Sequence, residues 1–197
     1  PDKASMEALS KEFQTLQQLA ASKGVDLLKG RSLDSIIAKY EGDPVKAVTA
    51  LKDTALSELP SKLSGQVEYN AGILYHHLGA IEEAREAYGK AVDQGGSDDE
   101  LKAAALQNLG VLTHQDALAT LAADPDEAIA KLKKAQTYYL GALRHKGSDP
   151  QLARNQELLL RHQQAAEQLK VLLKQFEDLT KQARESLEHA IESQNDL

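Results

Sequence analysis

The chain lacks the residues that make covalent cross-links and membrane spans. Among its 197 residues there is no Cys and no Trp, and it has one Met. The absence of Cys excludes disulfide bonds and thiolate metal sites, but it leaves the compartment open, because cytosolic and periplasmic proteins can both lack Cys. No apolar run approaches the roughly 18 residues of a transmembrane helix, so we expect no direct membrane insertion.

Aromatic residues are also scarce, and this bears on the fold class. They make up 4% of the chain, too few for the core of a typical β-sandwich or barrel, whereas the 42% apolar content is enough for one helical core. No segment shows convincing strand alternation. The composition therefore predicts an all-α protein.

Positive charge is in deficit. The formal net charge is -7 and the isoelectric point is near 5.4, and no basic run stands out. Nucleic acids and anionic membranes are also negatively charged, so the chain cannot neutralise their surface charge. We therefore expect no nucleic-acid partner. The first residues show no signal-peptide pattern, and the chain begins at Pro1 rather than Met. Cytoplasmic and bacterial periplasmic locations both stay open.

Proline is used as helix punctuation. Asp43-Pro44, Asp124-Pro125 and Asp149-Pro150 each predict an N-cap Asp followed by Pro in the first helical turn. The pattern D-P-x-x-A-[V/I]-x-x-L-K occurs at residues 43–52 and again at 124–133. Both copies predict the start of the second helix of a hairpin.

Small and aromatic residues recur at fixed spacing in residues 69–91, which read YNAGILYHHLGAIEEAREAYGKA. The residues that carry this spacing are Gly72, Tyr75, Gly79, Ala84, Tyr88 and Ala91. Three of them recur further along as Ala135, Tyr139 and Ala142, and Gln107-Asn108-Leu109-Gly110 matches the beginning of the segment. We interpret Gly72 and Ala84 as sites where two antiparallel helices cross closely, with Tyr75 and Tyr88 filling the space beside the crossing.

This pattern resembles the tetratricopeptide repeat (TPR) family, although Glu68 stands where the family usually has Trp and Ala71 where it usually has Leu. The resemblance implies a TPR-like right-handed solenoid of helical hairpins. The second repeat is longer than the usual length of about 34 residues, so we expect extended helices, reaching about Ala122 and running from Pro125 to about His145.

Three regions follow from these patterns. Residues 1–60 are expected to hold N-terminal helices at 5–23, 32–40 and 44–59, of which the last two form a degenerate repeat and the first a cap. Residues 61–149 hold two TPR-like repeats. Residues 150–197 form a capping and extended C-terminal helix, either single or divided near Glu177-Asp178.

The C-terminal region contains no Gly, and its only Pro is Pro150. Its apolar residues keep a three-to-four spacing typical of coiled-coil seams: Leu159, Ala166, Leu169, Leu173, Phe176, Ala183, Leu187 and Ala190. One interpretation is that this helix covers the last hairpin as a solvating cap. The alternative is an oligomerising structural protein that acts through its long C-terminal helix.

The TPR resemblance also implies a binding groove, because the first helix of each repeat lines the concave face. In such domains an Asn can hydrogen-bond a ligand backbone or terminal carboxylate, and the matching positions are Asn70, Asn108 and Asn155. The predicted partner-binding residues are Tyr69, Asn70, Ile73, His76, His77, Asn108, Val111, His114, Arg154, Asn155 and Arg161. Gln66 and Gln151 stand where a carboxylate clamp needs Lys or Arg, which disfavours a full clamp.

Histidines gather at this predicted face, where His76 and His114 are flanked by His77 and His162. One hypothesis is that protonation of these histidines near neutral pH makes the groove more cationic and strengthens binding of acidic segments. No H-x-x-x-H pair anchors a metal site, so we expect no metal and no other cofactor. No nucleophile elbow, H-E-x-x-H motif or phosphate-binding loop is present, and Gly95-Gly96 is more typical of a helix stop. We therefore expect a non-enzymatic scaffold or adaptor that binds a protein or peptide partner.

A narrower resemblance rests on residues 149–158, including Asp149, Pro150, Arg154 and Asn155. This segment is similar to bacterial TPR proteins of the aerotolerance (Bat) type. The similarity implies a bacterial envelope protein whose repeats face the periplasm.

Overall fold

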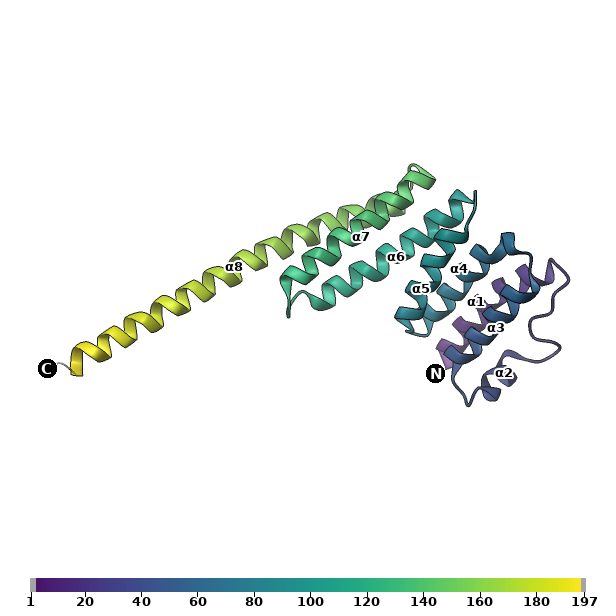
Figure 1. The fold of residues 1–197 in the computed structure, drawn as a ribbon, viewed down its shortest axis with the longest axis horizontal. Helices are drawn as coiled ribbons and strands as arrows, with labels where there is room; N and C mark the ends of the chain where they lie inside the picture. The colour runs from purple at the N-terminus through teal and green to yellow at the C-terminus, as the bar shows by residue number, and fades with distance from the viewer. Residues whose placement is uncertain (1–2, 196–197) are drawn as a thin grey trace.

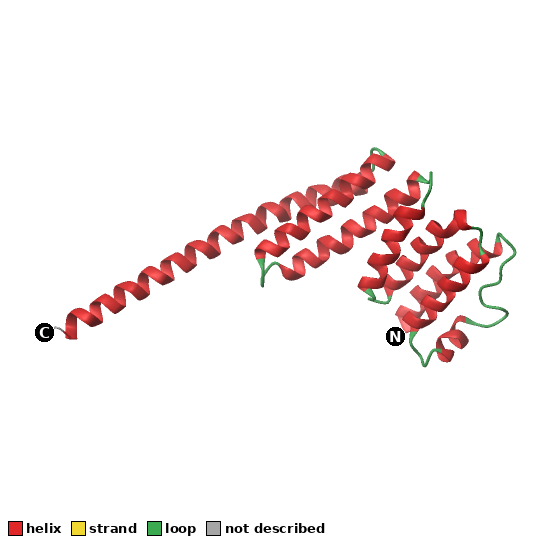
Figure 2. Cartoon of the chain, in the orientation of Figure 1, coloured by secondary structure: helices red, strands yellow, loops and turns green. Residues whose placement is uncertain are grey.

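The protein is all-α. The computed structural model describes residues 3–195, and within that range it contains eight α-helices, one 3-10 turn and no strand (Figure 2). The elements are α1 (Lys3–Ala21), α2 (Leu33–Lys39), α3 (Pro44–Glu58), η1 (Ser61–Leu63), α4 (Ser64–His77), α5 (Ile81–Gln94), α6 (Asp99–Thr120), α7 (Pro125–Lys146) and α8 (Pro150–Asn195).

The three predicted Asp-Pro helix starts are confirmed. The Asp43 carboxylate accepts hydrogen bonds from the backbone N–H groups of Val45 and Lys46 at 3.0 and 3.2 Å. Asp124 and Asp149 cap α7 and α8 in the same way, with shortest N···O distances of 2.9 and 2.8 Å. Each carboxylate satisfies backbone donors that have no partner inside the helix, which fixes where the helix begins.

The long elements also agree with the sequence. The helix expected to reach about Ala122 ends at Thr120, and the one expected to end near His145 ends at Lys146. The C-terminal region is a single helix of 46 residues and is not divided at Glu177-Asp178. Gly147 ends α7 with a φ of 69°, a conformation that favours glycine, and its N–H donates to the carbonyl of Leu143.

Helices that follow one another in the chain lie side by side from α3 onward. Helix α4 packs against α5, α5 against α6, α6 against α7, and α7 against α8 (Figure 1). The first half of α8 lies along α7, whereas its second half extends away from the rest of the molecule (Figure 1).

Two glycines allow the closest helix contacts. A Cβ atom at Gly72 would lie 2.7 Å from the Tyr88 ring, and one at Gly110 would lie 2.5 Å from the Tyr139 ring. Both rings are almost fully buried, at 1% exposure. The α4–α5 pair and the α6–α7 pair therefore share one contact, in which the second helix places a Tyr ring on a Gly of the first.

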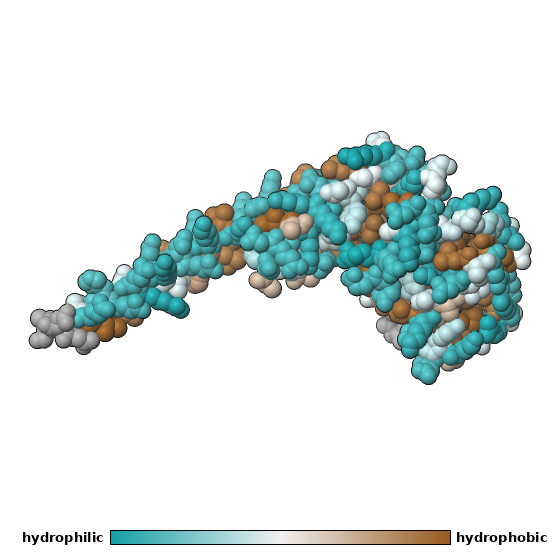
Figure 3. All heavy atoms as spheres, in the orientation of Figure 1, coloured by the Kyte–Doolittle hydropathy of each residue, from teal (hydrophilic) through white to brown (hydrophobic). Residues whose placement is uncertain are grey.

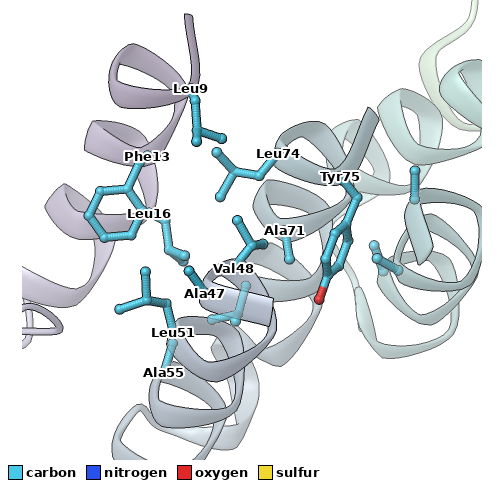
Figure 4. Packing of buried hydrophobic residues seen from close by; sticks show 14 of the residues in the cluster. Leu9, Phe13, Leu16, Ala47, Val48, Leu51, Ala55, Ala71, Leu74 and Tyr75 are labelled. Carbon is cyan, nitrogen blue, oxygen red and sulfur yellow. The ribbon is translucent and has the colours of Figure 1, made fainter. Parts of the chain in front are cut away.

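The N-terminal helices complete one hydrophobic core. Leu9, Phe13 and Leu16 of α1 point toward residues of α3 and α4 (Figure 4). Helix α2 adds Ile36 and Ile37 to the same core and packs on α3. A second core joins α6, α7 and the first part of α8.

A carboxylate lies inside the contact between α3 and α4. Glu68, where the TPR pattern has Trp, is 2% exposed, and its Oε2 atom has no hydrogen-bond partner. The Lys52 ammonium lies 3.9 Å from that oxygen. Burial raises the pKa of Glu68, and the nearby Lys52 opposes the rise.

The Gly110–Tyr139 contact generates a stability prediction. Gly110→Ala should lower the free energy of unfolding by about 2 kcal/mol, because the new methyl group overlaps a ring that is held on all sides. Gly89→Ala in α5 is the matched control, since a Cβ atom there meets nothing within 4 Å. It should raise stability by about 0.5–1 kcal/mol through helix propensity. Chemical denaturation followed by circular dichroism measures both, and equal effects would refute the close contact.

Candidate functional site

The centre of the candidate face is Tyr69 on α4. Its ring centroid lies 5.8 Å from that of Tyr88, and the residue is half-buried. Burial raises the pKa of the Tyr69 hydroxyl, whereas the nearby Asn108 side chain of α6 lowers it. The charges of Glu12 on α1 and Lys146 on α7 also act on this hydroxyl. Tyr69 of α4 therefore lies beside Tyr88 of α5, and its hydroxyl is influenced by side chains of α1, α6 and α7.

The next turns of α4 supply the remaining candidates of that helix. Asn70, Ile73 and His76 are half-buried, and Ile73 packs against the first core. His77 is exposed, with its Nε2 atom 3.8 Å from a carboxylate oxygen of Glu12. Burial lowers the pKa of His76, and the neighbouring His77 lowers it further. His76 therefore stays neutral to lower pH than a free imidazole.

On α6 the candidates differ in accessibility. Asn108 and Val111 are half-buried, whereas His114 is only 6% exposed. The His114 Nε2 atom lies 2.8 Å from the Nδ1 atom of His162 on α8, and its ring meets the edge of Tyr139 at a centroid distance of 6.4 Å. His114 thus joins three helices from inside and is not open to a partner.

The candidates on α8 separate into two groups. Asn155 is half-buried, whereas Arg154 and Arg161 are exposed. The Arg161 guanidinium lies 2.6 Å from a Glu157 carboxylate oxygen one turn earlier on the same helix. Tyr69 and Asn108 thus lie near each other, whereas the α8 arginines extend into solvent.

Two contributors to this region were not among the predicted binding residues. Glu12 reaches it from α1, and no spacing in the sequence relates α1 to α4. Lys146 pairs with Asp149 at 2.9 Å and influences Tyr69 through its charge from the end of α7, where three basic residues lie in the last turn. Basic residues at a helix C-terminus are also explained by the helix dipole, so this signal alone did not mark a site.

Within the part of the chain that the structure describes, no three His, Cys, Asp or Glu side chains gather in a group able to hold a metal ion. Across residues 3–195, every helix is too short or too polar to cross a bilayer.

Comparisons with known proteins give no further assignment, since no family model, curated protein or solved structure matches the chain. The TPR resemblance therefore rests on the residues described above, and a function has to be argued from their geometry.

The buried His114–His162 pair generates a pH prediction. Burial lowers the pKa of His114, and the nearby His162 lowers it further. The pKa of His in an unfolded chain is about 6.5. As the pH falls below this value, the unfolded chain binds more protons than the folded one, so acid destabilises the fold. His114→Gln should therefore lose less stability than the wild type when the pH falls from 7.5 to about 5.5.

Denaturant midpoints across this pH range provide the measurement. Comparing variant with wild type removes the contribution of Glu68, whose raised pKa acts in the opposite direction. His189→Gln, on the exposed end of α8, is the control and should keep the wild-type pH dependence. A wild-type slope in His114→Gln would contradict the prediction.

Proposed function

We propose that this protein is a non-enzymatic scaffold or adaptor that binds an extended segment of a protein partner on the face formed by α4 and α6. Its hairpins would constitute a TPR-like right-handed solenoid. The observation that carries the proposal is the repeated Gly–Tyr contact, Gly72 with Tyr88 and Gly110 with Tyr139. Because the contact makes the two hairpins equivalent, corresponding positions on α4 and α6 belong to one face.

The chemistry of this face suits an extended polypeptide. Ile73 and Val111 occupy equivalent positions one residue after the two glycines, and each is half-buried. They offer apolar contact to the side chains of a ligand. Asn70 and Asn108, two residues before the glycines, offer amide donors and acceptors to the ligand backbone. Half-buried polar groups of this kind gain most from a partner that also excludes water.

The charge near the face favours a segment without a strong net charge. Glu12 and Lys146, which both act on the Tyr69 hydroxyl, carry opposite signs. Gln66, rather than Lys or Arg, occupies the early α4 position where a terminal carboxylate would be clamped. The proposal therefore does not require a C-terminal peptide, and an internal segment fits equally well.

The test begins with selection of binding peptides from a displayed library of random sequences. Binding of a selected peptide is then compared between wild type and Asn70→Ala/Asn108→Ala. We expect the double variant to bind at least about tenfold more weakly, because each lost amide hydrogen bond contributes about 1 kcal/mol. Isothermal titration calorimetry provides the affinities.

The matched control is Glu82→Ala/Asp93→Ala, which removes two exposed side chains from α5. It should bind the peptide as the wild type does. Circular dichroism and melting temperature establish that both variants remain folded. Unchanged affinity in a folded Asn70→Ala/Asn108→Ala variant would overturn the proposal that α4 and α6 form the binding face.

A further inference from the structure

The apolar residues of α8 form a continuous row along the helix, which we call its seam. This seam extends beyond the part of α8 that α7 covers. Every seventh residue along the first part of α8 is completely buried, and these residues are Leu152, Leu159 and Ala166. The same row continues without a break through Leu173, Thr180 and Leu187. A spacing of seven residues is the repeat of a coiled-coil core position.

A second row completes the seam. Asn155, His162 and Leu169 are half-buried, and the row continues through Phe176, Ala183 and Ala190, which are exposed. Phe176 is 69% exposed and Leu187 is 62% exposed. Apolar patches follow the projecting part of α8 in the space-filling view (Figure 3).

The boundary between covered and exposed parts is the start of α7. Asp126, in the first turn of α7, forms an ion pair with Lys170 of α8. Beyond this contact α8 has no neighbouring helix, although the seam keeps its register (Figure 1). Helices in water obtain most of their stability from packing of an apolar face, so the continued seam favours a further helix over residues 173–190.

We infer that the missing helix is α8 of a second copy of this chain, paired in antiparallel orientation over residues 173–190. This inference goes beyond the proposed function and does not depend on it. Two observations favour a second copy of α8 as this helix. The exposed seam continues the interface that α8 already forms with α7, and the seam is complementary to itself in one register.

Self-complementarity is seen in the core layers. In the antiparallel register Leu173 faces the partner's Ala190, Phe176 faces the partner's Leu187, and Thr180 faces the partner's Ala183. Each layer occurs twice because the two copies are equivalent. The Phe176–Leu187 layers would bury the most apolar surface, and the central Thr180–Ala183 layers, built from small residues, would let the two helices approach closely.

Charges beside the seam favour the same register. Glu177 and Arg184 flank the core, and in the antiparallel pair each Glu177 lies beside the partner's Arg184. In a parallel pair Glu177 would instead lie beside the partner's Leu172, and Arg184 beside the partner's Leu179. Opposite charges flanking the core set partner choice and orientation in coiled coils.

There is also room for the C-terminal end of the partner's helix. In this register the last turn of the partner's α8 reaches the start of α7. A hollow of about 320 Å³ lies there, lined by Pro125, Asp126, Lys170, Leu173, Lys174 and Glu177. The partner helix would run in the same direction as α7, so α7 and the partner's α8 together would cover the whole seam.

Sedimentation equilibrium of the full chain over a concentration series tests the pairing. The wild type should change reversibly from monomer to dimer, since a paired length of about 27 Å is short for a permanent coiled coil. Phe176→Glu and Leu187→Glu should each weaken the dimer at least about 100-fold, because every dimer would bury two new charges. Both positions are exposed in the single chain, so its fold should be unaffected.

Val171→Glu is the matched control, because Val171 is 55% exposed and lies outside both rows of the seam. It should dimerise as the wild type does. A wild type that stays monomeric at every concentration would overturn the inference, and the seam would then belong to a different protein. Equal weakening by Val171→Glu would also overturn it, because the contact would not follow the seam.

Orientation is tested by cross-linking, for which the absence of Cys is an advantage. An equimolar mixture of Leu173→Cys and Ala190→Cys chains should form a mixed disulfide dimer on oxidation. Neither variant alone should cross-link, because like positions in the antiparallel pair are separated by about 25 Å. Efficient cross-linking of Leu173→Cys alone would indicate a parallel pair and contradict the inferred register.

Discussion

The whole fold depends on one steric condition, which is that a tyrosine ring lies directly on the backbone of a neighbouring helix. Tyr88 and Tyr139 meet this condition only because Gly72 and Gly110 have no side chain. The contact fixes both the separation and the rotation of each helix pair, since a ring is rigid and its surroundings are closely packed. The position of the face that carries Tyr69 and Asn108 is therefore fixed by buried residues on the inner side of the helices. A partner bound to that face would not contact these residues.

Much of this arrangement could be predicted from the sequence, because its causes are local. An Asp-Pro pair specifies a helix start whatever lies around it, and α3, α7 and α8 begin where these pairs stand. The sequence alone does not decide between one C-terminal helix and two, since an apolar repeat does not itself exclude a bend at Glu177-Asp178. The absence of Gly and internal Pro agrees with the single continuous helix in the structure.

The candidate site was less predictable, because accessibility depends on contacts between segments that are distant in the chain. His114 has the spacing of a groove residue, yet it is enclosed by Tyr139 and His162 from two later helices. Glu12 became part of the region through the packing of α1 along α4. Spacing along one helix tells which residues share a side, but it does not tell what covers that side.

The unbroken α8 has a consequence for how this chain can vary. Each residue inserted into a helix turns everything beyond it by about 100° and moves it by about 1.5 Å. An insertion near Lys170 would leave the packing on α7 intact, but it would rotate Leu173, Thr180 and Leu187 away from their common line with Leu159. Length changes in this helix therefore preserve its phase only in steps close to whole heptads, so α8 can gain or lose reach in those steps but not continuously.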